Sequence, residues 1–505
     1  MDMPFVQLRE GLVDPKAVRL IPQPLAQSVD CLALFKVRKT LTVAISDPTN
    51  LAHIDRIEQA TGLRVRPVLV LRSTLAQLRT RCYEDDFRVD AVTADLDVDA
   101  IAVNEDAIQV ELQSVDSIAD GSPVINLVNY VILQAVRQGS SDIHIEPGPR
   151  HSSVRYRVDG QLREVLRPRR EFHPAIVSRV KVMAKLDIAE HRMPQDGRVH
   201  VVVDRREIDL RVSTLPTVLG EKIVLRVLDR ANVTFELDEL GFRSEMLDEF
   251  KAILARPHGL VLATGPTGSG KTTTLYSAIE LVKSVERNIV TVEDPVEYQL
   301  DLINQVHANP ATSLTFAKVL RSILRQDPDV IMVGEIRDAE TAEVAIQAAL
   351  TGHLVLSTLH TNDSVSAVTR LMDMGIASYK IAASLVGIVA QRLLRTICPD
   401  CRSTYFPPAE ILEALQYAGN RDRQFIRGEG CVKCFDTGFK GRVGVYELLT
   451  VDREVRDLIG RNVSVDELRQ LRRNRGGSTL LEEGVRLAER GVTSLDEVMR
   501  VALCE

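Results

Sequence analysis

One short glycine-rich segment limits the fold of this chain more than any other feature. It follows an apolar run at residues 260–263 and precedes a helical pattern that runs from Lys271 to about Ser284. Its spacing is Gly-x-x-x-x-Gly-Lys-Thr, in which glycines let backbone N–H groups wrap phosphate oxygens at a helix N-terminus. The residues expected to bind nucleotide phosphates are Gly265, Pro266, Thr267, Gly268, Ser269, Gly270, Lys271, Thr272 and Thr273. A strand, a glycine-rich loop and a helix in this order predict an α/β nucleotide-binding domain.

The chain around this segment alternates short apolar runs with helical stretches, which is typical of a buried parallel sheet. The runs are residues 260–263, 289–292, 330–333 and 354–357. We expect residues 236–505 to form a RecA-like P-loop ATPase domain of the α/β class with a parallel sheet, preceded by smaller α/β domains. Residues 452–505 have a helical pattern and are expected to form C-terminal helices.

Five side chains are expected to carry the chemistry of ATP hydrolysis. Lys271 should reach the β and γ phosphates of ATP, and the Thr272 hydroxyl should bind Mg²⁺. Glu335 follows the third apolar run, where it should orient the attacking water or assist the metal. Glu293 follows the second run and should add a carboxylate at the same edge of the sheet. His360 follows the fourth run and should sense the γ phosphate, with a purely structural histidine as the alternative.

Two Cys-x-x-Cys pairs follow the last apolar run. They are Cys398 with Cys401 and Cys431 with Cys434, and 29 residues separate the two pairs. Four thiolates in this arrangement are typical of a structural zinc site, because four sulfurs leave no open position on the metal. We therefore expect Zn²⁺ to hold a subdomain at residues 396–442.

The first half of the chain carries no catalytic pattern. Residues 1–83 have the pattern of a small α/β domain suited to docking a partner. Residues 84–120 contain twelve acidic residues and one basic residue, which indicates a linker. Residues 121–235 combine a helical pattern with alternating strands and many arginines, and we expect a second, PAS-like α/β domain there.

Charge and composition limit the classes of partner that this chain is expected to bind. The formal net charge of −7 and the absence of tryptophan argue against nucleic acid as a partner, because single strands bind on aromatic stacking platforms. The first residues lack the layout of a signal peptide, and no apolar stretch approaches the about 20 residues that cross a bilayer. We expect a cytoplasmic chain that meets a membrane only peripherally, through partners or an acidic phospholipid surface.

Together these motifs resemble the secretion ATPases of type II secretion and type IV pilus assembly, the GspE and PilB-like family. The likeness runs from about residue 123 to residue 505 and is most specific at residues 325–338 and 351–361. The paired cysteines are similar to the assembly branch and unlike the pilus-retraction branch. The resemblance implies a homohexamer whose ATP turnover drives an inner-membrane platform protein to add pilin-like subunits to a fibre.

The resemblance also gives a role to two arginines. Arg211 and Arg226 match positions that approach the nucleotide phosphates in the family, where each second domain packs on a neighbouring subunit. There they would neutralise charge in the transition state. Without the resemblance they would be interpreted as solvated charges on a hairpin face.

The resemblance does not decide which of the two assembly systems this chain serves. Residues 350–354 and 367–375 favour type II secretion, with type IV pilus assembly as the alternative and a nucleic-acid translocase as a weaker third hypothesis. Residues 1–30 lack the Arg-Leu-Gly and leucine repeats through which some relatives bind cyclic dinucleotides. Regulation by such a ligand is therefore not expected.

Overall fold

The computed structural model describes residue 13 and residues 15–37, 40–47, 51–83, 101–103, 123–204, 206–229, 235–309, 313–462 and 464–502. The chain forms two compact units, residues 1–158 with 162–231 and residues 159–161 with 232–505. Most of the expected acidic linker at residues 84–120 lies outside the described residues, and the domain limits given above remain predictions. Among the helices described, none is long and apolar enough to cross a membrane.

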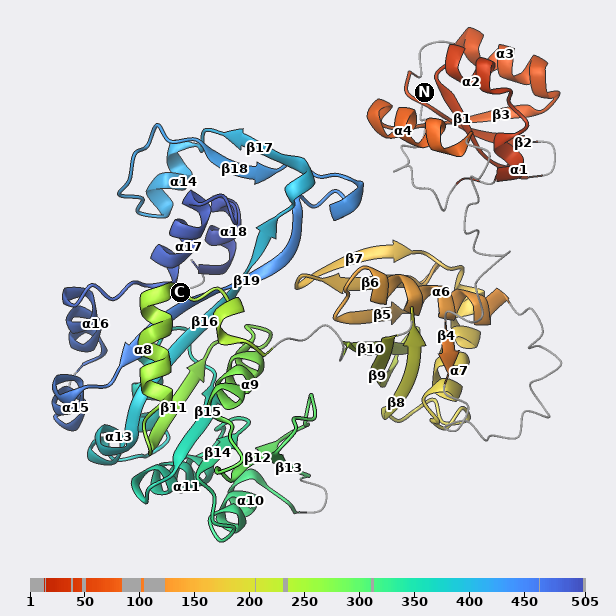
Figure 1. The fold of residues 1–505 in the computed structure, drawn as a ribbon. Helices are drawn as coiled ribbons and strands as arrows, with labels where there is room; N and C mark the ends of the chain where they lie inside the picture. Colours follow the sequence, from red (N-terminus) through yellow and green to blue (C-terminus); the bar gives the residue numbers. More distant parts are fainter. Residues whose placement is uncertain are drawn as a thin grey trace. The chain divides into compact units, whose positions relative to one another are not determined.

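The first unit begins with a small three-stranded sheet covered by short helices (Figure 1). Its strand order is β1-β2-β3, with β1 antiparallel and β3 parallel to β2. Residues 41–45 of β2 are all buried, so both faces of this strand are covered, and its near-continuous apolar run is typical of such a strand. The elements are α1 (Pro15–Val18), α2 (Gln23–Ser28), β1 (Cys31–Val37), β2 (Thr40–Ile45), α3 (Leu51–Thr61), β3 (Arg64–Leu69) and α4 (Arg72–Cys82).

The second sheet of this unit has seven strands in the order β4-β8-β9-β10-β5-β6-β7. Its apolar face packs against α6 and α7, and Tyr156 of β6 donates a hydrogen bond to Val131 O of α6 at 2.7 Å. The opposite face carries charged side chains, because strand residues alternate between the two faces. The elements are β4 (Ile101–Val103), α6 (Pro123–Arg137), β5 (Asp142–Glu146), β6 (Ser153–Val158), β7 (Gln161–Leu166), α7 (His173–Met183), β8 (Gln195–Val203), β9 (Arg206–Thr217) and β10 (Gly220–Asp229).

The second unit contains the expected nucleotide-binding fold. Its sheet has the order β13-β12-β14-β15-β11-β16-β19, and all neighbours are parallel except β16 and β19. The four predicted apolar runs correspond to β11, β12, β14 and β15. The elements up to β16 are α8 (Ser244–Leu254), β11 (Gly259–Thr264), α9 (Lys271–Val282), β12 (Ile289–Glu293), β13 (Ile303–His307), α10 (Phe316–Ile323), β14 (Val330–Val333), α11 (Ala339–Leu350), β15 (Leu354–Leu359), α12 (Ser366–Asp373), α13 (Ser378–Ser384) and β16 (Leu385–Ile397).

The last part of the chain adds a small insert and four helices. The insert lies between β16 and β19, and its own two strands, β17 and β18, pair antiparallel. The C-terminal helices are α15 to α18, as the sequence pattern predicts. The elements are β17 (Arg402–Tyr405), α14 (Ala409–Ala414), β18 (Phe425–Gly428), β19 (Phe439–Thr450), α15 (Arg453–Gly460), α16 (Val465–Asn474), α17 (Leu480–Glu489) and α18 (Leu495–Ala502).

Candidate functional site

The glycine-rich segment forms the turn between β11 and α9. Gly265, Gly268 and Gly270 have φ angles of 149°, 80° and 88°, a region that other residues enter only with strain. A Cβ atom on Gly265 would lie 2.6 Å from the backbone oxygen of Gln391, so the close approach of β16 also favours glycine at that position. The turn therefore presents backbone N–H groups at the N-terminus of a helix, which is a site suited to phosphate.

Lys271 is folded back onto this turn. Its Nζ donates hydrogen bonds to Gly265 O at 2.8 Å and Pro266 O at 2.9 Å, and the residue is 8% exposed. The pKa of Lys271 is lowered to about 8, chiefly by burial; the nearby Glu335 opposes this shift, and Arg392 adds to it. The ammonium group thus lies in the loop, close to a carboxylate at the end of another strand.

Two hydroxyl groups complete the fit to a nucleotide. Ser269 is 3% exposed, and its buried Oγ has no hydrogen-bond partner within the described part of the chain. A buried polar atom without a partner is costly, and a phosphate oxygen would satisfy it. Thr272 is exposed in the first turn of α9, where its hydroxyl would hold Mg²⁺. The residues present therefore fit ATP with its metal ion.

Glu335 lies beside His360, as the sequence predicts for two strand ends that meet at one edge. Glu335 Oε1 forms an ion pair with Arg337 Nη2 at 2.5 Å, and Oε2 lies 3.5 Å from His360 Nε2. The Glu335 side chain is 14% exposed, whereas that of His360 is 47% exposed. The carboxylate is thus shielded but reachable from the phosphate loop.

Hydroxyl groups of β15 fix the position of Glu335. Ser357 Oγ donates to Val333 O at 2.7 Å, and Thr358 Oγ1 donates to Gly334 O at 2.8 Å. These bonds hold the end of β14 beyond its regular pairing with β15. The backbone before Glu335 is therefore held by side chains as well as by the sheet.

Glu293 has a more enclosed environment than its expected catalytic role suggests. It is 4% exposed, and its carboxylate accepts hydrogen bonds from Tyr276 Oη, from Thr291 Oγ1 at 2.6 Å and from Gln305 Nε2 at 3.1 Å. Burial and the neighbouring Glu293 raise the pKa of Tyr276, so that its hydroxyl stays a donor. Glu293 thus ties α9 to β12 and β13 beneath the phosphate loop.

The two predicted arginines lie side by side on the charged face of the first unit. Arg211 of β9 pairs with Arg226 of β10 on one side and with Arg198 of β8 on the other. Arg226 in turn pairs with Asp142 of β5, which pairs with Arg157 of β6. Directly opposite residues have Cβ atoms about 5 Å apart, so these five side chains form one row across five strands. The sequence pointed to Arg211 and Arg226, and strand pairing adds Arg198.

Part of this arginine row borders a hollow of about 430 Å³. Asp142 lies between two of the arginines, with Oδ1 3.4 Å from Arg226 Nε and Oδ2 3.6 Å from Arg157 Nε. Arg198 is exposed and has no ion-pair partner among the described residues. The row therefore carries excess positive charge on an open surface, which is suited to an anionic group from another molecule or subunit.

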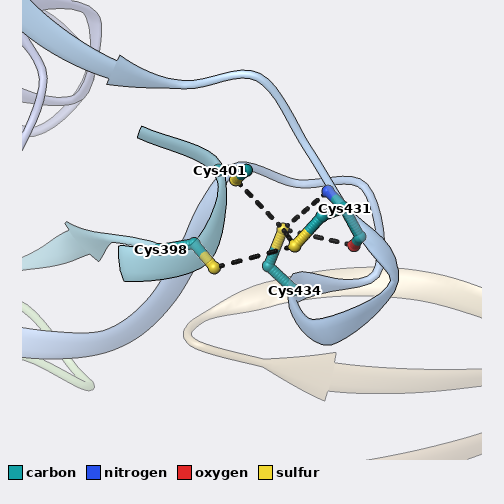
Figure 2. Close-up of side chains that lie close together, drawn as sticks. All are labelled: Cys398, Cys401, Cys431 and Cys434. Atoms are coloured by element: carbon teal, nitrogen blue, oxygen red, sulfur yellow. Dashed lines mark hydrogen bonds between the residues drawn. The ribbon is translucent and has the colours of Figure 1, made fainter. Parts of the chain in front are cut away.

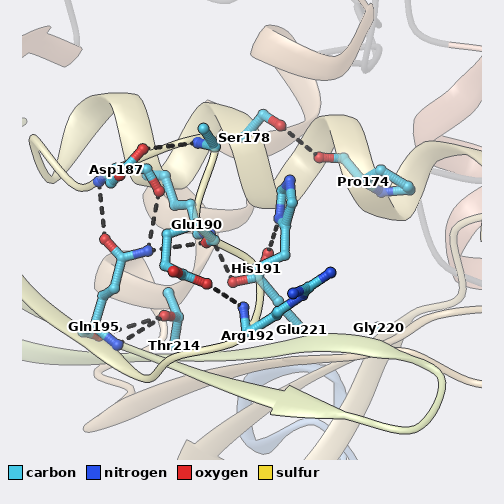
Figure 3. A network of polar contacts seen from close by, with 12 residues as sticks. Pro174, Ser178, Asp187, Glu190, His191, Arg192, Gln195, Thr214, Gly220 and Glu221 are labelled. Atoms are coloured by element: carbon cyan, nitrogen blue, oxygen red, sulfur yellow. Dashed lines mark hydrogen bonds and ion pairs between the residues drawn. The ribbon is translucent and has the colours of Figure 1, made fainter.

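A polar network holds the loop that leads into β8 and its Arg198 (Figure 3). The fully buried Lys181 donates to Glu190 O at 2.6 Å and forms an ion pair with Glu221 Oε1 at 2.6 Å. His191 Nδ1 lies 2.7 Å from Glu221 Oε2, and Gln195 Nε2 donates to Glu190 O at 3.1 Å. A lysine removed from water needs such partners, so the loop is fixed to the sheet.

The four cysteines converge on one point in the insert (Figure 2). Their sulfur atoms all lie within 4.8 Å of one another, with 3.9 Å between Cys398 and Cys431, 3.8 Å between Cys401 and Cys434, and 3.7 Å between Cys431 and Cys434. A tetrahedral zinc with Zn–S bonds of about 2.3 Å has sulfur atoms about 3.8 Å apart. The cluster is therefore compatible with zinc.

Backbone donors support the same cluster. Cys434 Sγ accepts hydrogen bonds from Cys431 N at 3.1 Å and from Gly438 N at 3.3 Å. Burial raises the pKa of the Cys434 thiol, but these donors outweigh it and lower the pKa to about 7. N–H groups that point at a thiolate are the outer contacts that orient a metal ligand.

Comparisons with known proteins agree with this geometry. The family model described as Type II/IV secretion system protein matches residues 117–500, and the MshEN domain matches residues 1–89. The chain is 48% identical over 398 residues to the Type II secretion system ATPase E of Vibrio cholerae serotype O1, covering 79% of this chain and 77% of that protein. It is 41% identical over 509 residues to the Type IV pilus assembly ATPase PilB of Myxococcus xanthus, covering 98% and 88%.

Solved structures give the same result. The pilus retraction motor PilT with bound ADP matches 73% of this chain and 95% of its own, at a TM-score of 0.51 and 28% identity. The ATPase DotB of Legionella pneumophila matches 74% and 94% at a TM-score of 0.55, and at 22% identity it supports the fold alone. The resemblance noted from the motifs and the α/β fold class are confirmed. The chain therefore belongs to the type II/IV secretion system family, as a secretion or pilus-assembly ATPase.

Proposed function

We propose that this chain hydrolyses ATP at its phosphate loop to power the assembly of pilin-like subunits by a type II secretion system. One observation carries the proposal. The buried Ser269 hydroxyl has no hydrogen-bond partner among the residues that the structure describes, and it lies with the folded-back Lys271 in a helix-capping turn near the shielded carboxylate of Glu335. This arrangement supplies phosphate donors on one side and a base on the other, which is what phosphoryl transfer to water requires.

In the proposed reaction, Lys271 turns from the loop carbonyls to the β and γ phosphates. Mg²⁺ held at Thr272 would neutralise charge on the same phosphates. Glu335 orients a water molecule toward the γ phosphorus and accepts its proton as the new P–O bond forms and the bond to ADP breaks. His360, beside Glu335 at 3.5 Å, senses whether the γ phosphate is present.

Arginines supplied by a neighbouring subunit complete this proposal. Arg211 and Arg226 lie in a row with excess positive charge on an open face. In a homohexamer that face meets the nucleotide of the next subunit, and its guanidinium groups stabilise charge in the transition state. The ring forms in the cytoplasm and meets the inner membrane through a platform protein and its acidic phospholipid surroundings.

Zinc has a separate role in the proposal. Zn²⁺ bound by the four cysteines would stabilise the insert between β16 and β19 without taking part in hydrolysis, because four sulfur ligands leave no open position.

Type IV pilus assembly is the second candidate, and one observation favours it. The match to the pilus assembly ATPase PilB covers 98% of this chain, whereas the match to the Vibrio cholerae secretion ATPase covers 79%. The N-terminal residues are thus shared with the pilus relative. Binding of residues 1–89 to the cytoplasmic domain of one platform and not of the other distinguishes the two candidates.

The experiment that tests the function measures the ATPase rate against protein concentration. We expect a steep rise as rings form and a further gain with the cytoplasmic domain of an inner-membrane platform protein and with vesicles that contain acidic phospholipid. DNA is the control. A rate that is independent of concentration and raised by DNA would contradict the proposal and favour a translocase, whose arginine row would then face a phosphate backbone.

A further inference from the structure

Strand β16 continues past the end of β11 and lies against the phosphate loop. Gln391 Oε1 accepts a hydrogen bond from Thr274 Oγ1 of α9 at 2.7 Å. A Cβ atom on Gly265 would lie 2.6 Å from Gln391 O and 3.2 Å from Arg392 Nη1. The first glycine of the loop therefore has Arg392 as a direct neighbour, and a shift of the loop would be felt there.

Arg392 reaches from the phosphate loop to the segment that follows β15. The residue is 8% exposed, and Nη2 donates to Asn362 O at 3.0 Å and to Asn362 Oδ1 at 3.2 Å. Nη1 donates to Gln391 O at 3.1 Å. Asn362 comes two residues after His360, so one guanidinium group lies beside the phosphate loop and donates to the histidine segment.

The far end of the histidine segment is anchored separately. Ser364 donates from its backbone N and its Oγ to Glu447 Oε1, at 3.0 Å and 2.6 Å. Asp363 Oδ2 forms an ion pair with Arg469 Nη2 at 2.5 Å. These contacts tie the segment to β19 and α16. Arg392 holds the end of the segment that lies next to His360.

The charges around Arg392 indicate that its position depends on whether an anionic ligand is bound. Arg392 and Lys271 lie close enough for the arginine to lower the pKa of the lysine, and Glu335 acts in the opposite direction. Two buried cations near one carboxylate repel each other until further negative charge arrives. The phosphates of a nucleotide supply that charge.

We propose that Arg392 is a positioning residue, which couples the binding of phosphate in the loop to the position of His360. The inference rests on the proposed nucleotide site and adds a contact within one subunit. When phosphate binds, Lys271 leaves the carbonyl groups of Gly265 and Pro266, the loop adjusts, and the guanidinium group of Arg392 moves Asn362 with it. His360, whose Nε2 lies 3.5 Å from Glu335 Oε2 in the free chain, then shifts relative to that carboxylate.

The test compares Arg392→Gln with the full-length wild-type chain. In the wild type, ADP should slow hydrogen exchange at the amides of residues 360–364. In Arg392→Gln this response should be lost and kcat should fall about tenfold or more, while the Kd for ADP stays within about threefold. Combining Arg392→Gln with His360→Ala should lower kcat no further than His360→Ala alone, because both changes affect one step.

Matched controls separate this role from simple destabilisation. Arg395 lies on the same strand, is also 8% exposed and pairs with Glu497 Oε2 at 2.7 Å, so Arg395→Lys should keep the exchange response. Arg392→Lys keeps the charge but lacks the planar fork with which Nη1 donates to Gln391 O and Nη2 donates to Asn362 O. It should also lose the response, and it decides the matter if Arg392→Gln does not fold.

Three outcomes would overturn the inference. The first is a normal kcat and exchange response in Arg392→Gln or in folded Arg392→Lys. The second is a Kd raised about 100-fold with kcat unchanged, because Arg392 would then be a ligand contact. The third is the same loss in Arg395→Lys. Lys271→Ala distinguishes the two proposals, since nucleotide binding that survives in that variant contradicts the proposed site itself.

Discussion

The phosphate loop and the cysteine cluster are both built on tight turns of the same unit, but they differ in what they leave unsatisfied. In the described part of the chain, the loop keeps a hydroxyl without a hydrogen-bond partner at Ser269 and a lysine that is held by carbonyl groups. The cluster directs all four sulfur atoms at one point and supports Cys434 with two backbone donors. The first arrangement suits a ligand that enters and leaves, whereas the second suits an ion that stays.

Because the two sites differ in this way, substitutions can affect ATP hydrolysis and the stability of the insert separately within one domain. Substitutions in the phosphate loop, the open site, should stop ATP hydrolysis and leave the fold intact. Substitutions in the cysteine cluster, the closed site, should release metal and destabilise the insert before they affect hydrolysis. The arginine row of the first unit resembles the phosphate loop, because Arg198 has no ion-pair partner within the described ranges of the chain.

The largest effect is expected for Glu335→Gln. Loss of the carboxylate that accepts the proton of water should lower kcat by about 10³-fold or more and leave ATP binding unchanged. Single-turnover hydrolysis and nucleotide titration measure the two properties. Glu293→Gln is the comparison, because Glu293 lies in a buried network. An equal loss in that variant, with unchanged stability, would show that Glu293 also has a catalytic role.

Arg211→Ala and Arg226→Ala should each lower the rate of the assembled ring by up to about 10³-fold. The nucleotide affinity of the isolated subunit should not change, because the arginines act on a neighbour. Arg206→Ala is the control, since Arg206 lies on the same sheet and pairs with Asp229 at 2.9 Å. Wild-type rates in either test variant, measured in rings of confirmed size, would remove the arginine row from the reaction.

Cys398→Ser should weaken zinc binding by more than about 100-fold, which is the upper range for loss of an outer contact alone. The insert should unfold at a lower temperature, because metal binding contributes to its folding. Metal content and thermal unfolding are the measurements. Asp400→Ala changes the same turn without removing a sulfur and should keep the metal. A wild-type chain purified without zinc would contradict the closed-site interpretation.

The smallest expected effect is a pH dependence of nucleotide affinity. The pKa of Lys271 is lowered to about 8 in the free chain, mainly by burial. Phosphate binds the charged form, so affinity should be nearly constant below pH 7 and about tenfold lower at pH 9. Titration of ADP at several pH values measures this, with Lys271→Arg as the control because arginine stays charged. A flat profile in the wild type would contradict the buried position of this lysine.

The sequence predicts the local sites well and the long-range ones less well. The phosphate loop and the cysteine pairs follow from residues close together in the chain. The arginine row requires strand register, although a hairpin that pairs Val203 with Arg206 already places Arg198 opposite Arg211. The enclosure of Glu293 could not be predicted, because Tyr276 and Gln305 come from other elements.

The strand β16 shows a physical limit of pattern analysis. Its thirteen residues, Leu385–Ile397, are almost all buried, so they show no alternation that would distinguish a strand from a buried helix. Its partner β19 lies more than 40 residues later in the chain. The contact of Arg392 with Asn362 could therefore not be predicted, because it depends on a strand that local sequence periodicity does not identify.

The position of the cysteine cluster has a consequence for how such motors diversify. The insert begins after Ile397, which pairs with Phe439, so it occupies the tip of a hairpin whose strands belong to the main sheet. A tip of this kind can be exchanged for a short turn without altering the order of any strand. A shortened descendant needs only new cover for the surface of α18 that packs against Leu412 and Phe425. The cysteine insert could therefore be gained or lost without changing the sheet that carries the phosphate loop.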